Sequence, residues 1–159
     1  LHSRRLHARR HAQSAGGRIM SGYGFVYVLT SPAMPGLYKV GATTRSPRQR
    51  AEELSRGTGV PHEFEVAFYA EVQEPFLWER RVHALLSDKR LSSSREFFYG
   101  PLIDIINTIE GDGECLSYWD SDQATEARNP GMVWPGKPLW FEQNLHSAGY
   151  LERLRRNAQ

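Results

Sequence analysis

Two apolar runs separated by a turn-forming segment stand out near the beginning of the chain. The first is GFVYVL at 24–29 and the second is LYKVG at 37–41. Segment 31–36 between them holds two prolines and a glycine, which are typical of a turn between two strands. The pattern therefore predicts a β-hairpin.

The pairing of this hairpin decides which side chains meet. If Leu29 pairs with Leu37, then Tyr27 lies opposite Lys39, with both side chains on one face and roughly 5 Å apart. This register is an inference, because a slip of one residue would turn every side chain to the other face. The sequence leaves two interpretations open: a functional pair, or a half-buried strand tyrosine beside a solubilising lysine.

Helix signals follow the hairpin. Ser46 before Pro47 is typical of a helix start, because serine caps the free N–H groups and proline fits the first turn. Periodicity and chain breakers then predict a helix, a strand and three more helices: 47–56, 64–72, 75–86, 102–109 and 141–156. We expect an α+β fold, with a small three-stranded antiparallel sheet flanked by helices in the order β-β-α-β-α-α.

Composition divides the chain into three parts. Residues 1–21 form a basic leader that we expect to be disordered, residues 22–110 form the folded domain, and residues 111–159 form an acidic extension ending in an amphipathic helix. We expect the three tryptophans of the extension to pack back on the domain: Trp119, Trp134 and Trp140.

Charge is unevenly distributed along the chain. The net charge is only +2, yet no Asp or Glu precedes Glu52, and the residues before it carry nine Lys and Arg. The asymmetry suggests an anionic partner such as nucleic acid phosphate. The alternative is that the arginines of residues 1–18 simply belong to the leader.

Two absences narrow the function classes. Cys115 is the only cysteine, which excludes an intrachain disulfide and a zinc site of paired cysteines. No apolar run approaches the ~20 residues of a membrane span, so we expect a cytoplasmic protein with no membrane partner. The oligomeric state is left open.

Two charged residues are predicted to point inward. Arg50 shares a helix face with Leu54, so its guanidinium requires a carboxylate or a bound phosphate as partner. Glu79 and His83 are one turn apart on the apolar stripe that includes Phe76. A carboxylate in that position is costly unless it meets a cation or a metal.

Taken in order, these motifs resemble a known family. They are Tyr27 in the first strand, Lys39-Val40-Gly41-Ala42-Thr43 in the second, Arg50 with Leu54, Glu79 with His83, and Arg95-Glu96-Phe97-Phe98. The set resembles the GIY-YIG nuclease superfamily over about residues 23–109. It is most similar to a phage-related branch, named after an open reading frame of a coliphage, in which Lys-Val-Gly or Lys-Ile-Gly replaces Tyr-Ile-Gly.

The resemblance implies a divalent-metal-dependent endonuclease that hydrolyses DNA phosphodiester bonds. Tyr27 would be the general base, with Lys39 lowering its pKa. Arg50 and Lys39 would stabilise charge on the phosphate. Glu79 would be the sole protein ligand of one Mg²⁺ or Mn²⁺, which would keep mostly water and substrate oxygens.

The chain also departs from the family pattern. Lys39 stands in place of the second signature tyrosine, and Leu54 stands where many members have a histidine. His83 is either a catalytic substitute for that histidine or a histidine at the edge of the core. Glu96, near the place of an asparagine in many relatives, is either an auxiliary site residue or a capping acid.

We assign substrate binding to Thr43, Arg45, Arg48 and Glu96. A second hypothesis is a catalytically inactive module, derived from a nuclease, that binds nucleic acid or a protein. No recognised DNA-binding motif is present, and the acidity of the extension argues against a DNA clamp. A protein partner could therefore supply target specificity.

Overall fold

The computed structural model describes residues 22–57, 63–93, 96–111 and 115–136, together with Glu152 and Arg156. The leader expected at 1–21, Trp140 and nearly all of the helix expected at 141–156 lie outside the described residues. None of the described helices is long and apolar enough to cross a lipid bilayer.

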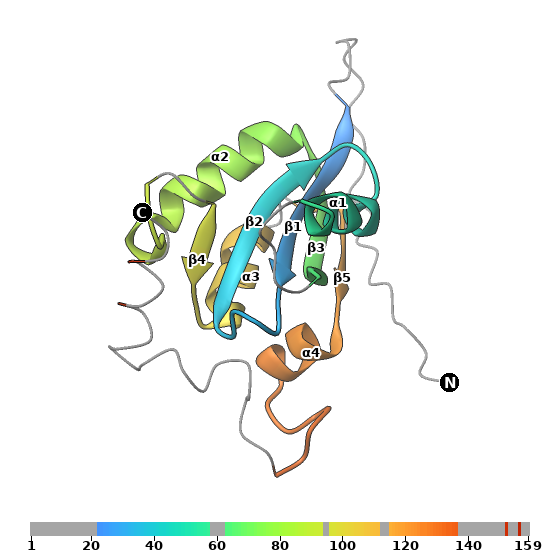
Figure 1. Cartoon of the computed structure of the whole chain (residues 1–159). Coiled ribbons are helices and arrows are strands. Elements are labelled where there is room, and N and C mark those ends of the chain that lie inside the picture. Colours follow the sequence, from blue (N-terminus) through green and yellow to red (C-terminus); the bar gives the residue numbers. More distant parts are fainter. Residues whose placement is uncertain are drawn as a thin grey trace.

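The described residues form an α+β fold around one antiparallel sheet (Figure 1). Its five strands are β1 (Tyr23–Thr30), β2 (Leu37–Thr43), β3 (Glu65–Gln73), β4 (Phe97–Tyr99) and β5 (Ser117–Asp120), in the spatial order β4-β2-β1-β3-β5. The expected sheet of three strands is therefore wrong. The three expected strands form its centre, and two short strands that carry little sequence signal of their own extend its edges.

The hairpin of β1 and β2 forms as predicted, but its register differs. Leu29 pairs with Lys39 and Tyr27 pairs with Gly41, two residues further along β2 than expected. The connecting segment uses two successive turns, closed by backbone hydrogen bonds from Met34 to Ser31 and from Leu37 to Met34. Because the shift is an even number of residues, the predicted face of each side chain is unchanged.

Four α-helices lie among the described residues, on the two faces of the sheet. They are α1 (Pro47–Ser55), α2 (Pro75–Leu85), α3 (Leu102–Glu110) and α4 (Asp122–Arg128), and the single 3-10 turn η1 (Ser87–Lys89) follows α2. Ser46 caps α1 by accepting a hydrogen bond from the Gln49 N–H, as its sequence predicted. Helix α1 covers one face, while α2, α3 and α4 pack on the other (Figure 1).

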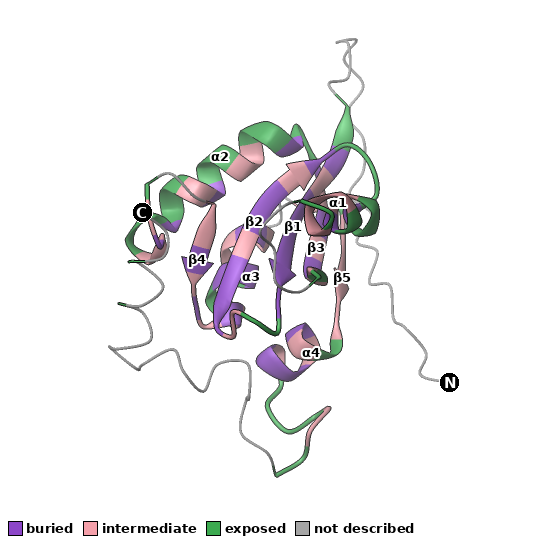
Figure 2. Ribbon diagram, viewed as in Figure 1, coloured by how far each residue is buried: buried purple, intermediate pink, exposed green. Residues whose placement is uncertain are grey.

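The two faces bury unequal cores. Val26, Val28 and Phe68 belong to the large core, which is completed by apolar residues of α2, α3 and α4. The small core under α1 centres on Tyr27, Leu29 and Ala51. Figure 2 shows the buried residues concentrated in the central strands and on the helix sides that face them.

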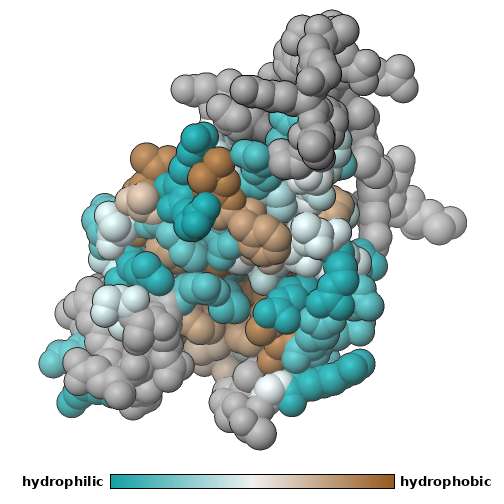
Figure 3. Space-filling view, turned by 90° about the horizontal axis from the view of Figure 1, so that it is seen from above, coloured by the Kyte–Doolittle hydropathy of each residue, from teal (hydrophilic) through white to brown (hydrophobic). Residues whose placement is uncertain are grey.

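The apolar stripe of α2 differs from the predicted one. Val82 and Leu86 are buried, but Phe76 is 54% exposed, because Pro75 rather than Phe76 occupies the buried position at the start of the helix. Other large apolar side chains are also exposed: Tyr23, Leu77, Leu85, Leu116 and Met132. Seen from above, hydrophobic surface is interspersed with hydrophilic areas (Figure 3).

The described part of the acidic extension is more regular than its composition suggests. Ala124 and Ala127 of α4 join the large core, and Trp134 packs against it as expected. Trp119 of β5 stacks on Tyr69, with ring centroids 5.6 Å apart. Within residues 115–136, the described part thus contributes one strand and one helix to the same sheet and core.

Two sets of polar contacts hold this part in place. Arg128 forms ion pairs with Glu110 of α3 and with Asp120 of β5. Glu126, fully buried, accepts hydrogen bonds from the backbone N–H groups of Gly131, Val133 and Trp134. Burial alone would raise the pKa of Glu126, but these backbone hydrogen bonds outweigh it and leave that pKa below its ordinary value.

Candidate functional site

The candidate site forms where one edge of the sheet is left open. Strand β4 pairs with β2 as far as Lys39, and the Val40 N–H still donates to the Glu96 carbonyl, so the segment of β2 from Gly41 to Thr43 has no neighbouring strand on that side. Helix α2 runs along this free edge, and His83 Nε2 lies 3.0 Å from the Val40 carbonyl oxygen. The short length of β4 therefore allows side chains of α2 to approach the face of the sheet that carries Tyr27.

Tyr27 occupies space that a side chain at position 41 would need. A Cβ atom added to Gly41 would lie 2.4 Å from the Tyr27 hydroxyl oxygen and 2.6 Å from the ring carbon that bears it. The ring thus lies directly over the backbone of β2, with only 2% of the residue exposed. The register shift explains this contact, because it pairs Tyr27 with glycine rather than with Lys39.

Burial raises the pKa of the Tyr27 phenol above its ordinary value. The Arg50 guanidinium opposes this rise through a hydrogen bond and through its positive charge. The negative charges of Glu79 and Glu96 add to the rise. The main cation acting on the phenol is therefore Arg50, and not Lys39 as the sequence suggested.

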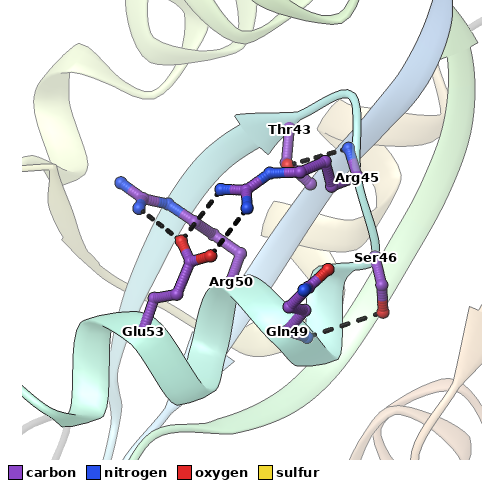
Figure 4. A network of polar contacts seen from close by, with 6 residues as sticks. All are labelled: Thr43, Arg45, Ser46, Gln49, Arg50 and Glu53. Atoms are coloured by element: carbon purple, nitrogen blue, oxygen red, sulfur yellow. Dashed lines mark hydrogen bonds and ion pairs between the residues drawn. The ribbon is translucent and has the colours of Figure 1, made fainter.

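Arg50 belongs to a cluster of two arginines and one carboxylate on α1 and the loop before it (Figure 4). Its Nη1 lies 3.0 Å from one oxygen of Glu53, and Arg45 Nη1 lies 2.8 Å from the other. The Thr43 hydroxyl accepts a hydrogen bond from the Arg45 N–H and shapes the loop. Sequence reasoning missed Glu53, although its spacing of three residues from Arg50 in a helix was a usable signal.

Lys39 is paired with Glu96. Its Nζ lies 2.9 Å from a carboxylate oxygen of Glu96 and 5.4 Å from the centre of the Phe97 ring. The pKa of Glu96 would be raised by burial, but its hydrogen bond from Lys39 and the lysine charge lower it below the ordinary value. Glu96 is therefore ionised at neutral pH and holds Lys39 beside the open edge of β2.

Glu79 differs from Glu53 and Glu96, because its carboxylate has no strong cationic partner. Burial raises its pKa from 4.5 to about 7, and the charge of Glu96 adds to this rise. Lys39 and Arg80 oppose it only through longer-range attraction. Its carboxylate lies 3.7 Å from His83 Nε2, but burial lowers the pKa of His83, so the ring is neutral at pH 7.

The surroundings of Glu79 can be compared with what Mg²⁺ or Mn²⁺ requires. Among the described residues, no three His, Cys, Asp or Glu side chains converge as a ready-made metal site. A desolvated carboxylate that lacks a matching cation nevertheless fits an ion that keeps most of its waters and adds substrate oxygens. Glu79 thus fits the role of single ligand for a weakly bound ion that binds together with substrate.

His83 contacts the backbone of β2 and the core, as one of the two interpretations of its sequence pattern predicted. With the proton on Nε2, the ring donates a hydrogen bond to the Val40 carbonyl, and it also packs against Phe98 at a centroid distance of 5.0 Å. These contacts fix α2 against the free edge of β2. They favour the interpretation of His83 as a core-edge histidine that positions Glu79.

The predicted site residues therefore separate into three groups. The structure brings together Tyr27, Lys39, Arg50, Glu79, His83 and Glu96 around the open edge of β2. Arg45 and Thr43 lie beside this group through Glu53 and the loop. Arg48 points away from it, with its guanidinium carbon 5.6 Å from the centre of the Trp119 ring.

Comparison with known proteins adds one finding. The family model described as T5orf172 domain matches residues 24–111, more than half of the chain. The matched segment contains the central strands and every residue of the candidate site. No curated protein and no solved structure matches the chain significantly.

Proposed function

Because the chain belongs to the T5orf172 domain family, which is related to GIY-YIG nucleases, we propose that it is a divalent-metal-dependent endonuclease that hydrolyses DNA. One observation carries this proposal: four groups converge at one open sheet edge. They are the Tyr27 phenol, the cations of Arg50 and Lys39, and the Glu79 carboxylate, whose negative charge no nearby cation fully balances. Phosphodiester hydrolysis needs those groups: a base for water, positive charge for the phosphate, and a ligand for a metal ion.

Arg50 would bind the scissile phosphate. Its side chain is 39% exposed, and it shares the single carboxylate of Glu53 with Arg45. Two guanidinium groups on one carboxylate leave one positive charge uncompensated, so a phosphate oxygen can bind without displacing Glu53. A planar guanidinium also matches the geometry of two phosphate oxygens, which supports a role in the transition state.

Glu79 would hold the metal ion. A bound Mg²⁺ or Mn²⁺ would lower the pKa of a coordinated water and neutralise charge on the phosphate. Glu79 must be ionised to act as ligand, and its pKa of about 7 makes that ionisation incomplete at neutral pH. Lys39 and Arg80 favour the ionised form, whereas Glu96 disfavours it.

Tyr27 would take a proton from the attacking water, and this role depends on Glu79. The charge of Glu79 is one of the contributions that raise the pKa of the phenol. Neutralising that charge removes this contribution, while the hydrogen bond and charge of Arg50 continue to favour the phenolate. The base would therefore become effective only when Glu79 has its cation and Arg50 has its phosphate nearby.

Cleavage of supercoiled plasmid in Mg²⁺ or Mn²⁺ tests the proposal. We expect the wild-type protein to nick the plasmid, EDTA to stop the reaction, and Glu79→Gln and Tyr27→Phe to slow it by at least about 100-fold. Glu52→Gln is the matched control, because Glu52 is exposed on α1 and contributes to none of these contacts. Equally intact plasmid with wild type and Glu79→Gln, across varied DNA sequences, would overturn the proposal.

A second function, a nucleic-acid-binding module without catalysis, is favoured by one observation. Arg50 and Lys39 both have internal carboxylate partners, and the pKa of Tyr27 is raised rather than lowered. In that case a DNA duplex would bind with similar affinity to wild type and Glu79→Gln, and neither protein would cleave it. A separate protein partner would then provide the target or the activity.

A further inference from the structure

A row of aromatic side chains extends from the candidate site across the sheet. Phe25 of β1, Tyr69 of β3 and Trp119 of β5 form this aromatic row. Phe25 meets Tyr69 edge to face at 5.5 Å, and Tyr69 stacks on Trp119 at 5.6 Å with 17° between the ring planes. Each of the three residues is only partly buried.

The aromatic row begins next to the proposed general base. Tyr27 and Tyr69 are direct partners in the pairing of β1 with β3, and Tyr69 is in turn the partner of Trp119 in the pairing of β3 with β5. Two strand spacings place Trp119 roughly 10 Å from Tyr27. Two or three stacked nucleotides cover that distance at about 3.4 Å each.

The Trp119 end of the aromatic row carries a positive charge. The Arg48 guanidinium lies over the Trp119 ring, and within the described residues it forms no ion pair. Arg50 belongs to the same helix as Arg48 and Arg45 to the loop before it, and Glu53 neutralises only one of these two charges. Glu71, which pairs with Phe25 between β3 and β1 and accepts a hydrogen bond from the Ser117 hydroxyl, places a carboxylate at the Phe25 end of the aromatic row.

We propose that the aromatic row, together with Arg48, binds unpaired bases of the DNA strand adjacent to the scissile phosphate. Aromatic rings bind single strands by stacking on base faces, and a nearby arginine contacts the strand backbone or the base plane. Base faces inside a duplex are covered by their neighbours, so the surface selects single-stranded or locally opened DNA. This inference rests on the proposed function, because it concerns the substrate of the same site.

Binding of fluorescein-labelled oligonucleotides in EDTA tests this inference without requiring cleavage. The probes are a 12-nucleotide single strand and the duplex of the same sequence, at one fixed salt concentration. We expect the wild-type protein to bind the single strand at least 10-fold more tightly. Trp119→Ala should weaken that binding by about 5- to 100-fold, while binding of the duplex changes less than 3-fold.

Three further variants keep the test decisive. Phe76→Ala removes an exposed aromatic ring on α2, which packs on the opposite face of the sheet from Tyr69, and should leave both affinities unchanged. Arg48→Ala alters only an exposed side chain and should weaken binding of the single strand more than Arg56→Ala does. Neither Arg48→Ala nor Arg56→Ala removes a packed ring. The comparison of these two variants therefore remains valid even if Trp119→Ala fails to fold.

Each possible result has one meaning. Equal affinities of wild type for both probes, or equal effects of Arg48→Ala and Arg56→Ala, would overturn the inference. Failure of both probes to bind below about 100 µM would point to a protein contact instead and would also overturn it. Plasmid cleavage in Mg²⁺ can persist in any of these cases, so failure of this inference is distinguishable from failure of the proposed function.

Discussion

Two clusters in this protein pair arginines with carboxylates, but the ratio of arginines to carboxylates is opposite in the two. Around Arg50, two guanidinium groups share the single carboxylate of Glu53. Around Arg128, a single guanidinium is shared by two carboxylates, Glu110 and Asp120. The first cluster therefore keeps a positive charge, whereas the second keeps a negative one.

The two clusters also differ in how far their arginines are exposed to solvent. The Arg128 side chain is 20% exposed, and its guanidinium lies 4.7 Å from the centre of the Tyr118 ring. Burial alone would lower the pKa of Arg128, but the two carboxylates outweigh it and raise that pKa. Arg50 is more exposed and lies at the open edge of the sheet. The comparison teaches that the ratio of charges, together with exposure, separates an arginine available to a ligand from one committed to the fold.

Replacing Arg128 should have the largest effect. Arg128→Met leaves two partly buried carboxylates without a cation, and we expect the free energy of unfolding to fall by about 3 kcal/mol or more. Urea denaturation followed by circular dichroism measures this. Arg56→Met, at an exposed residue, should change it by less than about 0.5 kcal/mol. Similar values for both variants would show that the Arg128 cluster does not hold the fold.

Replacing Arg50 should affect catalysis rather than stability. We expect Arg50→Met to slow plasmid cleavage by about 10²- to 10³-fold, because a charge that stabilises the transition state is lost. Its free energy of unfolding should change by no more than about 1 kcal/mol, since the ion pair with Glu53 is partly exposed. Wild-type cleavage by Arg50→Met, with Arg56→Met as control, would contradict the role assigned to the first cluster.

Glu79, which belongs to neither cluster, should make stability depend on pH. Its folded pKa of about 7 lies above the ordinary value of 4.5, so the folded state holds this proton more tightly than the unfolded state. The resulting stability is fully present below about pH 4.5 and is lost as the pH rises through 7.

Comparison of wild type with Glu79→Gln measures this contribution. In EDTA, the stability of wild type relative to Glu79→Gln should fall by up to about 3 kcal/mol between pH 5 and pH 8. Saturating Mg²⁺ should reduce the difference, because it binds the ionised form. A difference that is the same at both pH values in urea titrations would refute this account, and Glu52→Gln provides the control for an exposed carboxylate.

The smallest expected effect concerns the shared carboxylate of the first cluster. Glu53→Gln removes the negative charge that neutralises one of the two guanidinium groups, so we expect DNA binding to strengthen by about 2- to 5-fold at low salt. The slope of log affinity against log salt should steepen by about one unit for each added phosphate contact. Fluorescence anisotropy across a salt series measures both. Weaker binding by Glu53→Gln would mean that Glu53 acts by orienting Arg50 rather than by neutralising charge.

Local pattern was enough to predict the centre of the fold. The hairpin, the capped start of α1 at Ser46 and the strand β3 all follow from turn residues, capping and periodicity close in sequence. Strand β5 was missed because it is only four residues long and its partner β3 lies far away in the chain. Its stability comes from Trp119 on Tyr69 and from Arg128 on Asp120, contacts that no local pattern records.

The candidate site was predictable in composition but not in detail. Tyr27, Arg50 and Glu79 could be selected because each is a polar group placed on an apolar face. The pairing of Lys39 with Glu96 could not, because these residues are 57 positions apart. The register of the hairpin was missed as well, since a proline-rich connection allows more than one pattern of turns.

The contact between Tyr27 and Gly41 bears on how the site can vary during evolution. The Tyr27 ring lies against the main chain of β2. Its position is therefore fixed by the hydrogen bonds between β1 and β2, and not by the rotamers of neighbouring side chains. Its conformational entropy is lost once, on folding, and is not lost again when substrate binds. Side chains around it can then change without moving the hydroxyl. Position 41 is the one that must stay glycine as long as position 27 is tyrosine.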